Sequence, residues 1–245
     1  MGHMPDEAQG RMTARKICVV AGVGPGTGAA LSRRFAAGGY RVAMLARDAQ
    51  RLAALEREID GSRGYATDVT DATAVTDVVA RIRQDMGAPS VLLHNAVSGH
   101  FGEFLDIAPE VLERTFRTNV LSLLLLGQAI VPHMLAGGGG AIVITGNTSA
   151  WRGVASFAGF APSKAAQRIL AQSMARSLGP QGIHVAYIVV DAVIDVPWTR
   201  QAFASKPQEF FARPDAIADT AYHVAHQDRS AWSFEVDLRP FGEKW

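Results

Sequence analysis

The sequence has a single cysteine, Cys18, so no internal disulfide can form. An apolar run surrounds it, which predicts an inert core side chain. Neither sign of charge is in excess: 24 basic residues face 23 acidic ones without a basic run, which argues against nucleic-acid and anionic membrane partners. The sequence also lacks a cluster of histidine, cysteine and carboxylate residues with metal-ligand spacing. We therefore expect a small-molecule substrate and no metal.

Long hydrophobic runs are scarce as well. The longest, around residues 120–126, is too short to span a bilayer, and the N-terminus lacks the hydrophobic region of a signal peptide. We expect a cytoplasmic protein in which residues 1–15 are a tag remnant and a disordered tail. Residues 16–245 are expected to form one domain, because no linker, repeat or compositional change divides them.

From Ile17 onward, short β-branched runs alternate with longer segments of helical period. The expected strands are 17–22, 41–46, 64–67, 90–94, 141–145, 184–190 and 234–238. The expected helices are 26–37, 49–58, 72–86, 109–135, 157–178 and 215–226. This order predicts an α/β fold: a Rossmann-type, doubly wound parallel sheet of about seven strands with helices on both faces. Ligands should bind at the carboxyl ends of the strands.

A glycine-rich stretch, "AGVGPGTGAA", follows the first expected strand and opens the first expected helix. Gly22, Gly26 and Gly28 allow a tight turn and a close approach of the backbone to a pyrophosphate, with Thr27 between them at the helix N-terminus. Such a stretch can also be a plain structural turn. Its place between the first strand and the first helix favours dinucleotide binding.

The second expected strand ends in "MLARDAQRL", where the adenosine ribose of the cofactor would lie. A small residue, Ala46, followed by Arg47 leaves room and a positive charge for the 2′-phosphate of NADP, whereas an acidic residue would favour NAD. We therefore expect NADP(H). Alternatively, Arg47 is only solvated; we expect Asp48 to be the N-cap of the next helix.

Together these motifs resemble the short-chain dehydrogenase/reductase superfamily, over about residues 17–226. The resemblance implies that Asp68, with Val69 beside it, contacts the adenine and that Ile194 lies against the nicotinamide amide. In "HNAV", Asn95 and Ala96 match the family's Asn-Asn-Ala-Gly. This sequence departs from the family pattern at Ala21, His94, Val97, Asp191, Ala192 and Val196.

The family's catalytic motif is Tyr-x-x-x-Lys with a serine thirteen residues before the tyrosine. Lys164 matches the lysine, which also binds the nicotinamide ribose, but Phe160 stands at the tyrosine and Asn147 at the serine. A two-residue bulge would bring Ser149 to the serine's place. Asn119 matches the asparagine that holds a water linked to the lysine. Phe160 beside a kept Lys164, with "DLRP" near the end, resembles an atypical branch of this superfamily.

Phe160 cannot donate the proton that a reduced carbonyl requires, which typically costs on the order of 10²–10⁴ in rate. Three substitutes stay open: hydrogen bonds to the oxyanion, a proton from water or from the substrate itself, or a substrate that needs little acid help. Hydrogen-bonding residues for the first are Asn147, Thr148 and Ser149, and the water would be held by Asn119 and Lys164. His100 and His133 are expected to be ordinary surface or core residues.

Several aromatic residues follow the fourth and sixth expected strands or the motif after the fifth. The expected substrate-facing ones, some of which could instead be core, are Phe101, Phe104, Trp151, Trp198 and Phe203. Residues 197–213 lie where the family has a mobile lid. The apolar faces of 120–131 and 165–178 fit a homodimer or homotetramer, or ordinary core.

We therefore expect an NADP(H)-dependent oxidoreductase with an altered proton donor, acting on a small carbonyl, imine or enone-like substrate. The alternative is a catalytically silent NADP(H)-binding scaffold or sensor. Non-redox chemistry in the same pocket lacks an obvious base and ranks last.

Overall fold

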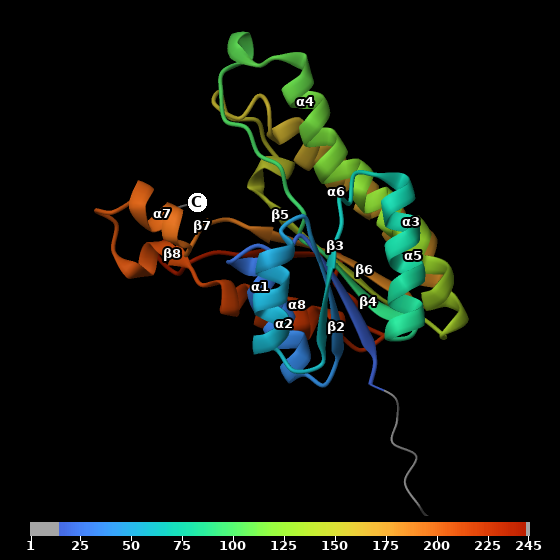
Figure 1. The fold of residues 1–245 in the computed structure, drawn as a ribbon. Helices are drawn as coiled ribbons and strands as arrows, with labels where there is room; N and C mark the ends of the chain where they lie inside the picture. The colour runs from blue at the N-terminus through green and yellow to red at the C-terminus, as the bar shows by residue number, and fades with distance from the viewer. Residues whose placement is uncertain (1–14, 244–245) are drawn as a thin grey trace, which may run out of the picture.

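Seven parallel strands form the central sheet of the protein, in the order β3-β2-β1-β4-β5-β6-β9 (Figure 1). The computed structural model describes residues 15–243. The strands are β1 Ile17–Ala21, β2 Arg41–Ala46, β3 Ser62–Ala66, β4 Pro89–His94, β5 Gly140–Asn147, β6 Ile183–Val190 and β9 Glu235–Leu238. The predicted doubly wound sheet is confirmed. The expected tail at residues 1–15 lies, except for Arg15, outside the described residues.

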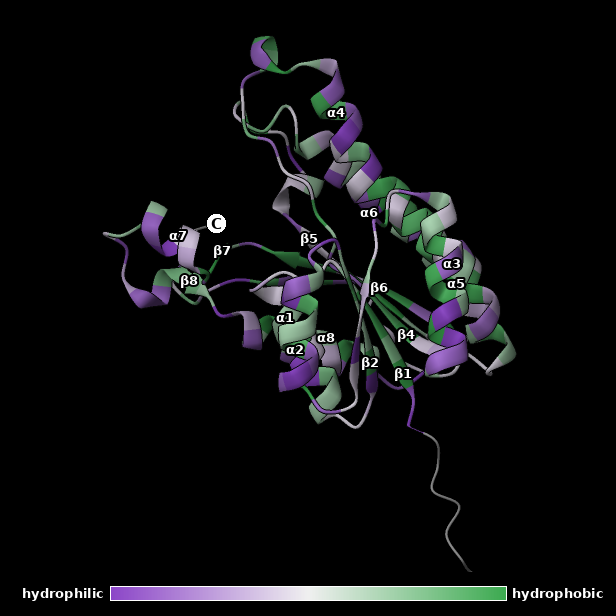
Figure 2. Ribbon diagram, viewed as in Figure 1, coloured by the Kyte–Doolittle hydropathy of each residue, from purple (hydrophilic) through white to green (hydrophobic). Residues whose placement is uncertain are grey.

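Helices cover both faces of this sheet. They are α1 Thr27–Ala37, α2 Ala49–Glu58, α3 Ala72–Asp85, α4 Pro109–Phe116, α5 Ser122–Ala136, α6 Ala161–Leu178, α7 Pro197–Ala202 and α8 Pro214–Ala225. Core residues of α1, α2 and α8 pack on one face, and those of α3, α5 and α6 on the other. Figure 2 shows the resulting hydrophobic strands between two helical layers.

Strand β1 shows how its sequence produces two cores. Its side chains alternate, so Val19 packs in the core under α3, α5 and α6, whereas Cys18 and Val20 pack in the core under α1, α2 and α8. Cys18 is fully buried, as predicted, and burial raises the pKa of its thiol.

The strand order reverses between β1 and β4, the two neighbours at the centre of the sheet. The connections that leave β1 and β4 therefore run to opposite sides of the sheet and leave a crevice at their carboxyl ends, where doubly wound folds bind dinucleotides. The loop before α4 and the segment around α7 both project beyond this edge of the sheet (Figure 1). The fold thus predicts the site's location before any side chain is considered.

Most predicted boundaries agree with the structure to within a few residues. The predicted bounds of α2 are confirmed, and Asp48 is its N-cap, because its side chain accepts a hydrogen bond of 2.9 Å from the backbone N–H of Arg51. Helix α6, in contrast, begins at Ala161 rather than at residue 157. Residues 157–160 make turn hydrogen bonds instead, and Pro162 lies in the first helical turn, where it is tolerated.

The region expected as one helix over 109–135 is continuous over Pro109–Ala136, with a π-helical segment at Arg117–Leu121 between α4 and α5. By length and composition alone it could cross a membrane, which contradicts the expectation that no segment is long enough. Its inward side chains, among them Leu123, Leu126 and Ile130, are buried against the sheet.

Three short elements were not predicted. Strands β7 Val193–Ile194 and β8 Phe211–Ala212 pair outside the main sheet, and α7 lies between them. Two-residue strands carry no detectable hydrophobic period, so pattern reasoning cannot find them. Helix α7 and strand β8 lie within the segment in which the resemblance implies a lid, and β7 precedes it.

Candidate active site

The turn between β1 and α1 leaves no room for a side chain at Gly22 or for one at Gly28, in the first turn of α1. Gly22 has a φ of +89°, and a Cβ there would lie 2.4 Å from the backbone nitrogen of Ala96. A Cβ on Gly28 would lie 2.4 Å from the carbonyl oxygen of Gly22. No side chain caps α1 at Gly26, and buried Thr27 is its first residue. The helix N-terminus is therefore available to an anion, and this cradle fits a pyrophosphate.

Asn95 ties this turn to the centre of the sheet. Its Nδ2 donates to the carbonyl of Gly22 at 2.8 Å, and its Oδ1 accepts from the hydroxyl of Thr145 at 2.9 Å. Ala96, the next residue, is buried against Gly22. The ends of β1, β4 and β5 are thus locked together at the crevice.

Two of the predicted adenosine-binding residues lie side by side beyond β2 and β3. Arg47 is exposed and follows half-buried Ala46. Asp68 is exposed and accepts hydrogen bonds from the backbone N–H and hydroxyl of Thr70, at 2.9 and 2.8 Å. These bonds, with a smaller effect of the Arg47 charge, hold the pKa of Asp68 below its usual range. Val69 beside it is buried.

Lys164 projects from α6 into the core and is 2 % exposed. Its Nζ donates to the backbone carbonyl of Thr145 at 3.1 Å and to Oε1 of Gln167 at 2.5 Å. Burial disfavours the charged form and lowers the pKa of this ammonium to about 7. The residue thus has two neutral partners and is poised to change charge near neutral pH.

Asn119 lies in the π-helical segment and is fully buried. Its side chain accepts from the N–H of Ser98 at 2.8 Å and donates to the carbonyl of Ser98 at 2.9 Å and to the hydroxyl of Ser163 at 2.8 Å. Its own carbonyl accepts from Nε2 of Gln167 at 2.7 Å. The resemblance implies a water between this asparagine and Lys164, but in this chain the side chain of Gln167 links the two.

His94 extends the same network and is fully buried. Its Nε2 lies 2.7 Å from the hydroxyl of Ser122, and its Nδ1 lies 3.3 Å from Nε2 of Gln167. Burial, and to a smaller extent the charge of Lys164, lower the pKa of His94 to about 3, so the imidazole is neutral. Sequence reasoning noted His94 only as a departure and missed Gln167 and Ser122. The spacing of Gln167, three residues after Lys164, puts both on one helix face and could have indicated the contact.

Phe160 is buried at the start of α6, where the family has its tyrosine. Its ring packs edge-on against Phe101 and Phe157, with ring centroids 5.8 and 6.3 Å away. We define Phe101, Phe157 and Phe160 as the phenylalanine cluster. Apolar ring contacts therefore surround the position at which the resemblance implies a tyrosine.

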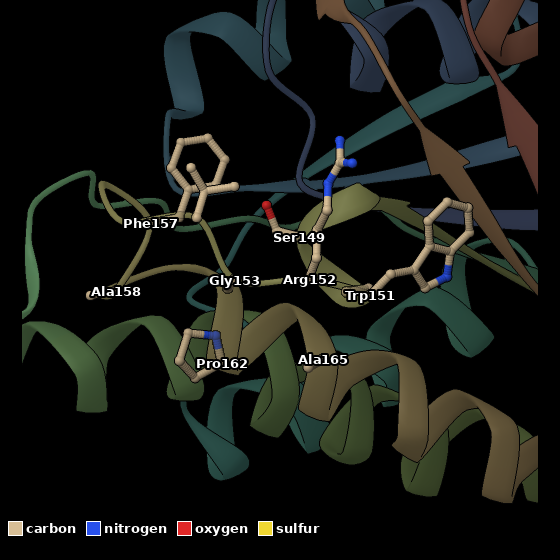
Figure 3. Close-up of a pocket in the computed structure, with 11 residues that line it drawn as sticks. Ser149, Trp151, Arg152, Gly153, Phe157, Ala158, Pro162 and Ala165 are labelled. Atoms are coloured by element: carbon tan, nitrogen blue, oxygen red, sulfur yellow. The ribbon is translucent and has the colours of Figure 1, made fainter. Parts of the chain in front are cut away.

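Strand β5 pairs with β6 without a register shift from Gly140 to Asn147. Ser149 lies in a short 3₁₀ turn directly after the strand, where Oδ1 of Asn147 accepts its backbone N–H at 3.2 Å. It is buried and lines a cavity of about 280 Å³ with Arg152 and Phe157 on one side and Pro162 on the other (Figure 3). Its match to the family's serine stays a prediction.

The five aromatic residues expected at the pocket are exposed, so none is plain core. Their exposed fractions are 58 % for Phe101, 82 % for Phe104, 45 % for Trp151, 65 % for Trp198 and 38 % for Phe203. Trp151 lines the cavity of Ser149, and Phe101 contacts Phe160.

The segment around α7 reaches the glycine turn. Ile194 is half-buried in β7, and two residues later Val196 approaches so closely that a Cβ on Gly26 would lie 2.5 Å from its Cγ1.

Two histidines were expected to be ordinary surface or core residues. His100 is exposed, and His133 is in the last turn of α5, where burial and the charge of Arg83 lower its pKa. Within residues 15–243, no group of three or more histidine, cysteine or carboxylate residues is arranged to hold a metal.

The glycine cradle generates a stability prediction. Gly22→Ala should lower the free energy of unfolding by about 1–3 kcal/mol, because it forces an alanine to positive φ and against the backbone of Ala96. Gly24→Ala is the matched control, since a Cβ there meets nothing within 4 Å; it should stay within about 0.5 kcal/mol of wild type. Denaturant unfolding measures the free energy of unfolding of both variants. Equal stability of the two would contradict the close backbone packing at Gly22.

Comparisons with known proteins agree with this geometry. The family model for short chain dehydrogenases matches residues 16–206. D-threitol dehydrogenase of Mycolicibacterium smegmatis is 27 % identical over 235 residues, covering 91 % of this chain and 90 % of its own. A metagenomic short-chain oxidoreductase solved in complex with NADP is 27 % identical with a TM-score of 0.80, covering 92 % and 97 % of the two chains.

One further solved structure is similar in fold. It is the NADPH-bound short chain oxidoreductase of Pseudomonas aeruginosa PAO1, described as containing an atypical catalytic center. Its TM-score is 0.85 at 21 % identity, and the match covers 94 % of this chain and 97 % of the other. At that identity the likeness concerns the fold alone.

Proposed function

The chain belongs to the short chain dehydrogenase family, and on that premise we propose that it is an NADP(H)-dependent oxidoreductase with an altered proton donor. Its substrate is a small carbonyl, imine or enone-like compound. We place it in the atypical branch in which phenylalanine replaces the catalytic tyrosine, here Phe160. The observation that carries the proposal is the cradle at the strand reversal: Gly22 and Gly28 let the backbone pack tightly in this turn, and no side chain caps the N-terminus of α1.

The residues of the crevice fit a dinucleotide along its length. The cradle would hold the pyrophosphate, and Asp68 and Val69 would contact the adenine. Ile194 lies in β7 and would contact the nicotinamide amide, as the resemblance implies. Lys164 would bind the nicotinamide ribose with the N–H that is left after its bonds to Thr145 and Gln167. When bound, NADPH supplies the hydride, and the protein supplies orientation and the electrostatic environment.

Arg47 supports a preference for NADP over NAD. It follows the small Ala46 at the end of β2, and it is exposed, so its guanidinium can form paired hydrogen bonds with a 2′-phosphate. The metagenomic relative was solved with NADP, which favours the same cofactor.

The proton side of the reaction must use groups other than Phe160. Ser149 can donate a hydrogen bond to a developing oxyanion, and so can the amide of Asn147, whose Oδ1 already accepts the N–H of Ser149. The proton itself would come from water in the crevice or from a group on the substrate. This arrangement favours iminium ions and polarised alkenes, whose reduction needs the least acid help at this position.

The outer faces of α5 and α6 support self-association. A groove of about 310 Å³ between them is lined by the apolar residues Leu124, Gly127, Val131, Met174 and Leu178, together with Gln128, Ser173 and Ser177. We propose a cytoplasmic homodimer or homotetramer that assembles through this groove. The near-neutral net charge of the protein fits an enzyme that acts on a small molecule and has no nucleic-acid or membrane partner.

NADPH oxidation against a panel of ketones, imines and enones tests the function. Wild type should turn over at least one class, and Lys164→Ala should lose most of that activity, because it removes the ammonium beside the crevice. The control variant Lys16→Ala removes an exposed lysine just before β1, and it should retain the activity of the wild type. Tight NADPH binding with no turnover in any class would instead indicate the silent scaffold or sensor.

Cofactor choice is tested by titrating NADPH and NADH into Arg47→Ala. The variant should lose about ten- to a hundredfold in NADPH affinity, the range for a hydrogen bond to a charged group, and little in NADH affinity. Arg57→Ala, which removes an exposed arginine from α2, controls for net charge. Equal losses for both cofactors, or none, would contradict the assignment of Arg47 to the 2′-phosphate.

A further inference from the structure

Gln167 is a fully buried side chain with bonds in four directions. Its Oε1 accepts from Nζ of Lys164 and, at 3.5 Å, from the hydroxyl of Tyr187. Its Nε2 donates to the carbonyl of Asn119 and lies within reach of Nδ1 of His94. Burying an amide without hydrogen-bond partners costs free energy, and here both the amide oxygen and the amide nitrogen have partners. These partners fix the position of the side chain.

The neighbours of Gln167 fix which of its atoms faces Lys164. The Asn119 carbonyl can only accept, so it requires the amide nitrogen on its side. The neutral His94 agrees: with its proton on Nε2 it donates to Ser122, whose hydroxyl donates to the carbonyl of Thr118, and its Nδ1 accepts from Gln167. The amide oxygen therefore faces the lysine.

We propose that Gln167 is a positioning residue that holds the ammonium of Lys164 at the crevice and closes the path between Lys164 and the Asn119 carbonyl to proton transfer. This inference rests on the proposed function, because only a cofactor in the crevice gives that position a use. A water or hydroxyl can both give and take a proton, whereas the carboxamide gives hydrogen bonds from one atom and accepts them at the other. The bridge fixes Lys164 without relaying protons.

Two consequences follow for the reaction. Of the three N–H groups of Lys164, two are used by Thr145 and Gln167, so one remains for the nicotinamide ribose. On the side of the core, Lys164 contacts the carboxamide of Gln167, which does not relay protons. Any proton that reaches the substrate must therefore enter from the crevice. The missing hydroxyl of Phe160 and the bridge of Gln167 thus act together: both remove the interior route for the proton.

The groups that face Lys164 do not change charge near neutral pH, so the titration of its ammonium can be followed separately. β4 contributes His94, which stays neutral at ordinary pH; β6 contributes Tyr187, whose pKa is raised by burial and by Glu235; and β5 contributes only the Thr145 carbonyl. Helix α6 itself contributes Gln167, and within residues 15–243 no carboxylate forms a hydrogen bond or ion pair with Lys164. Lys164 is therefore the group of this network that changes charge near pH 7.

The sequence contains only four lysines, so NMR of lysine-labelled protein can follow the Lys164 side chain through a pH titration of the cofactor-free chain. Gln167→Leu should lower the midpoint by about one pH unit or more, because it removes an acceptor that stabilises the ammonium. Gln167→Glu should raise it, because a carboxylate would then face the ammonium. Gln172→Leu, a half-buried glutamine on the same helix, is the matched control and should leave the midpoint in place.

NADPH titration across the same pH range completes the test. Affinity should weaken as pH rises through the midpoint in each variant, since the ammonium is the form that donates to the ribose, and the weakening should follow the shifted midpoints. A folded Gln167→Leu that titrates as wild type would overturn the inference, and if that variant does not fold, an unshifted midpoint in Gln167→Glu would overturn it. If wild type binds no NADPH at any pH, the proposed function fails, whereas shifted midpoints would still establish the bridge.

Discussion

A lysine ammonium that has no carboxylate partner among residues 15–243 is the constraint on which this site depends. Lys164 is buried, and its hydrogen bonds go to the Thr145 carbonyl and to Gln167. Burying a charge without an opposite charge is costly, and the cost shows in a pKa lowered to about 7. Two oxygen atoms that accept hydrogen bonds from the ammonium, one from β5 and one from α6, reduce this cost. Because β4, β5, the π-helical segment and α6 all contribute, the site cannot form until the whole sheet is assembled.

The same arrangement separates binding from proton supply. The cradle at Gly22 and Gly28 depends on backbone geometry alone, so it is independent of the residue at position 160. The phenylalanine cluster surrounds position 160 with apolar ring contacts. On this account a short-chain dehydrogenase keeps the cofactor site and moves the proton donor out to the crevice or to the substrate.

Much of the fold could be predicted from the sequence, because hydrophobic period reports burial. Strand β2 and helix α2 begin and end as predicted, since Asp48 and the alternation of β-branched residues mark them clearly. The start of α6 was predicted too early because Phe157 continues the apolar pattern although the backbone there still turns.

The site was harder to predict than the fold. The sequence motif located Lys164, Asn119 and the glycine turn, but not what they contact. Gln167 and His94 are 73 residues apart, and no local pattern signals that they meet. The match of Ser149 to the family's serine stays a prediction for a related reason: whether a strand bulges or turns depends on its neighbour β6, not on its own residues.

The most direct test of the account is the reduction of one ketone and one polarised alkene by Phe160→Tyr, with Phe157→Tyr as a control that adds a phenol to the same cluster at the wrong place. If the missing acid limits the reaction, Phe160→Tyr should raise kcat/KM for the ketone by about 10²–10⁴, the usual contribution of a positioned acid, and change the alkene little. Phe157→Tyr should change neither. Unchanged ketone reduction in a folded, NADPH-binding Phe160→Tyr would contradict the claim that the lost hydroxyl defines this protein's chemistry.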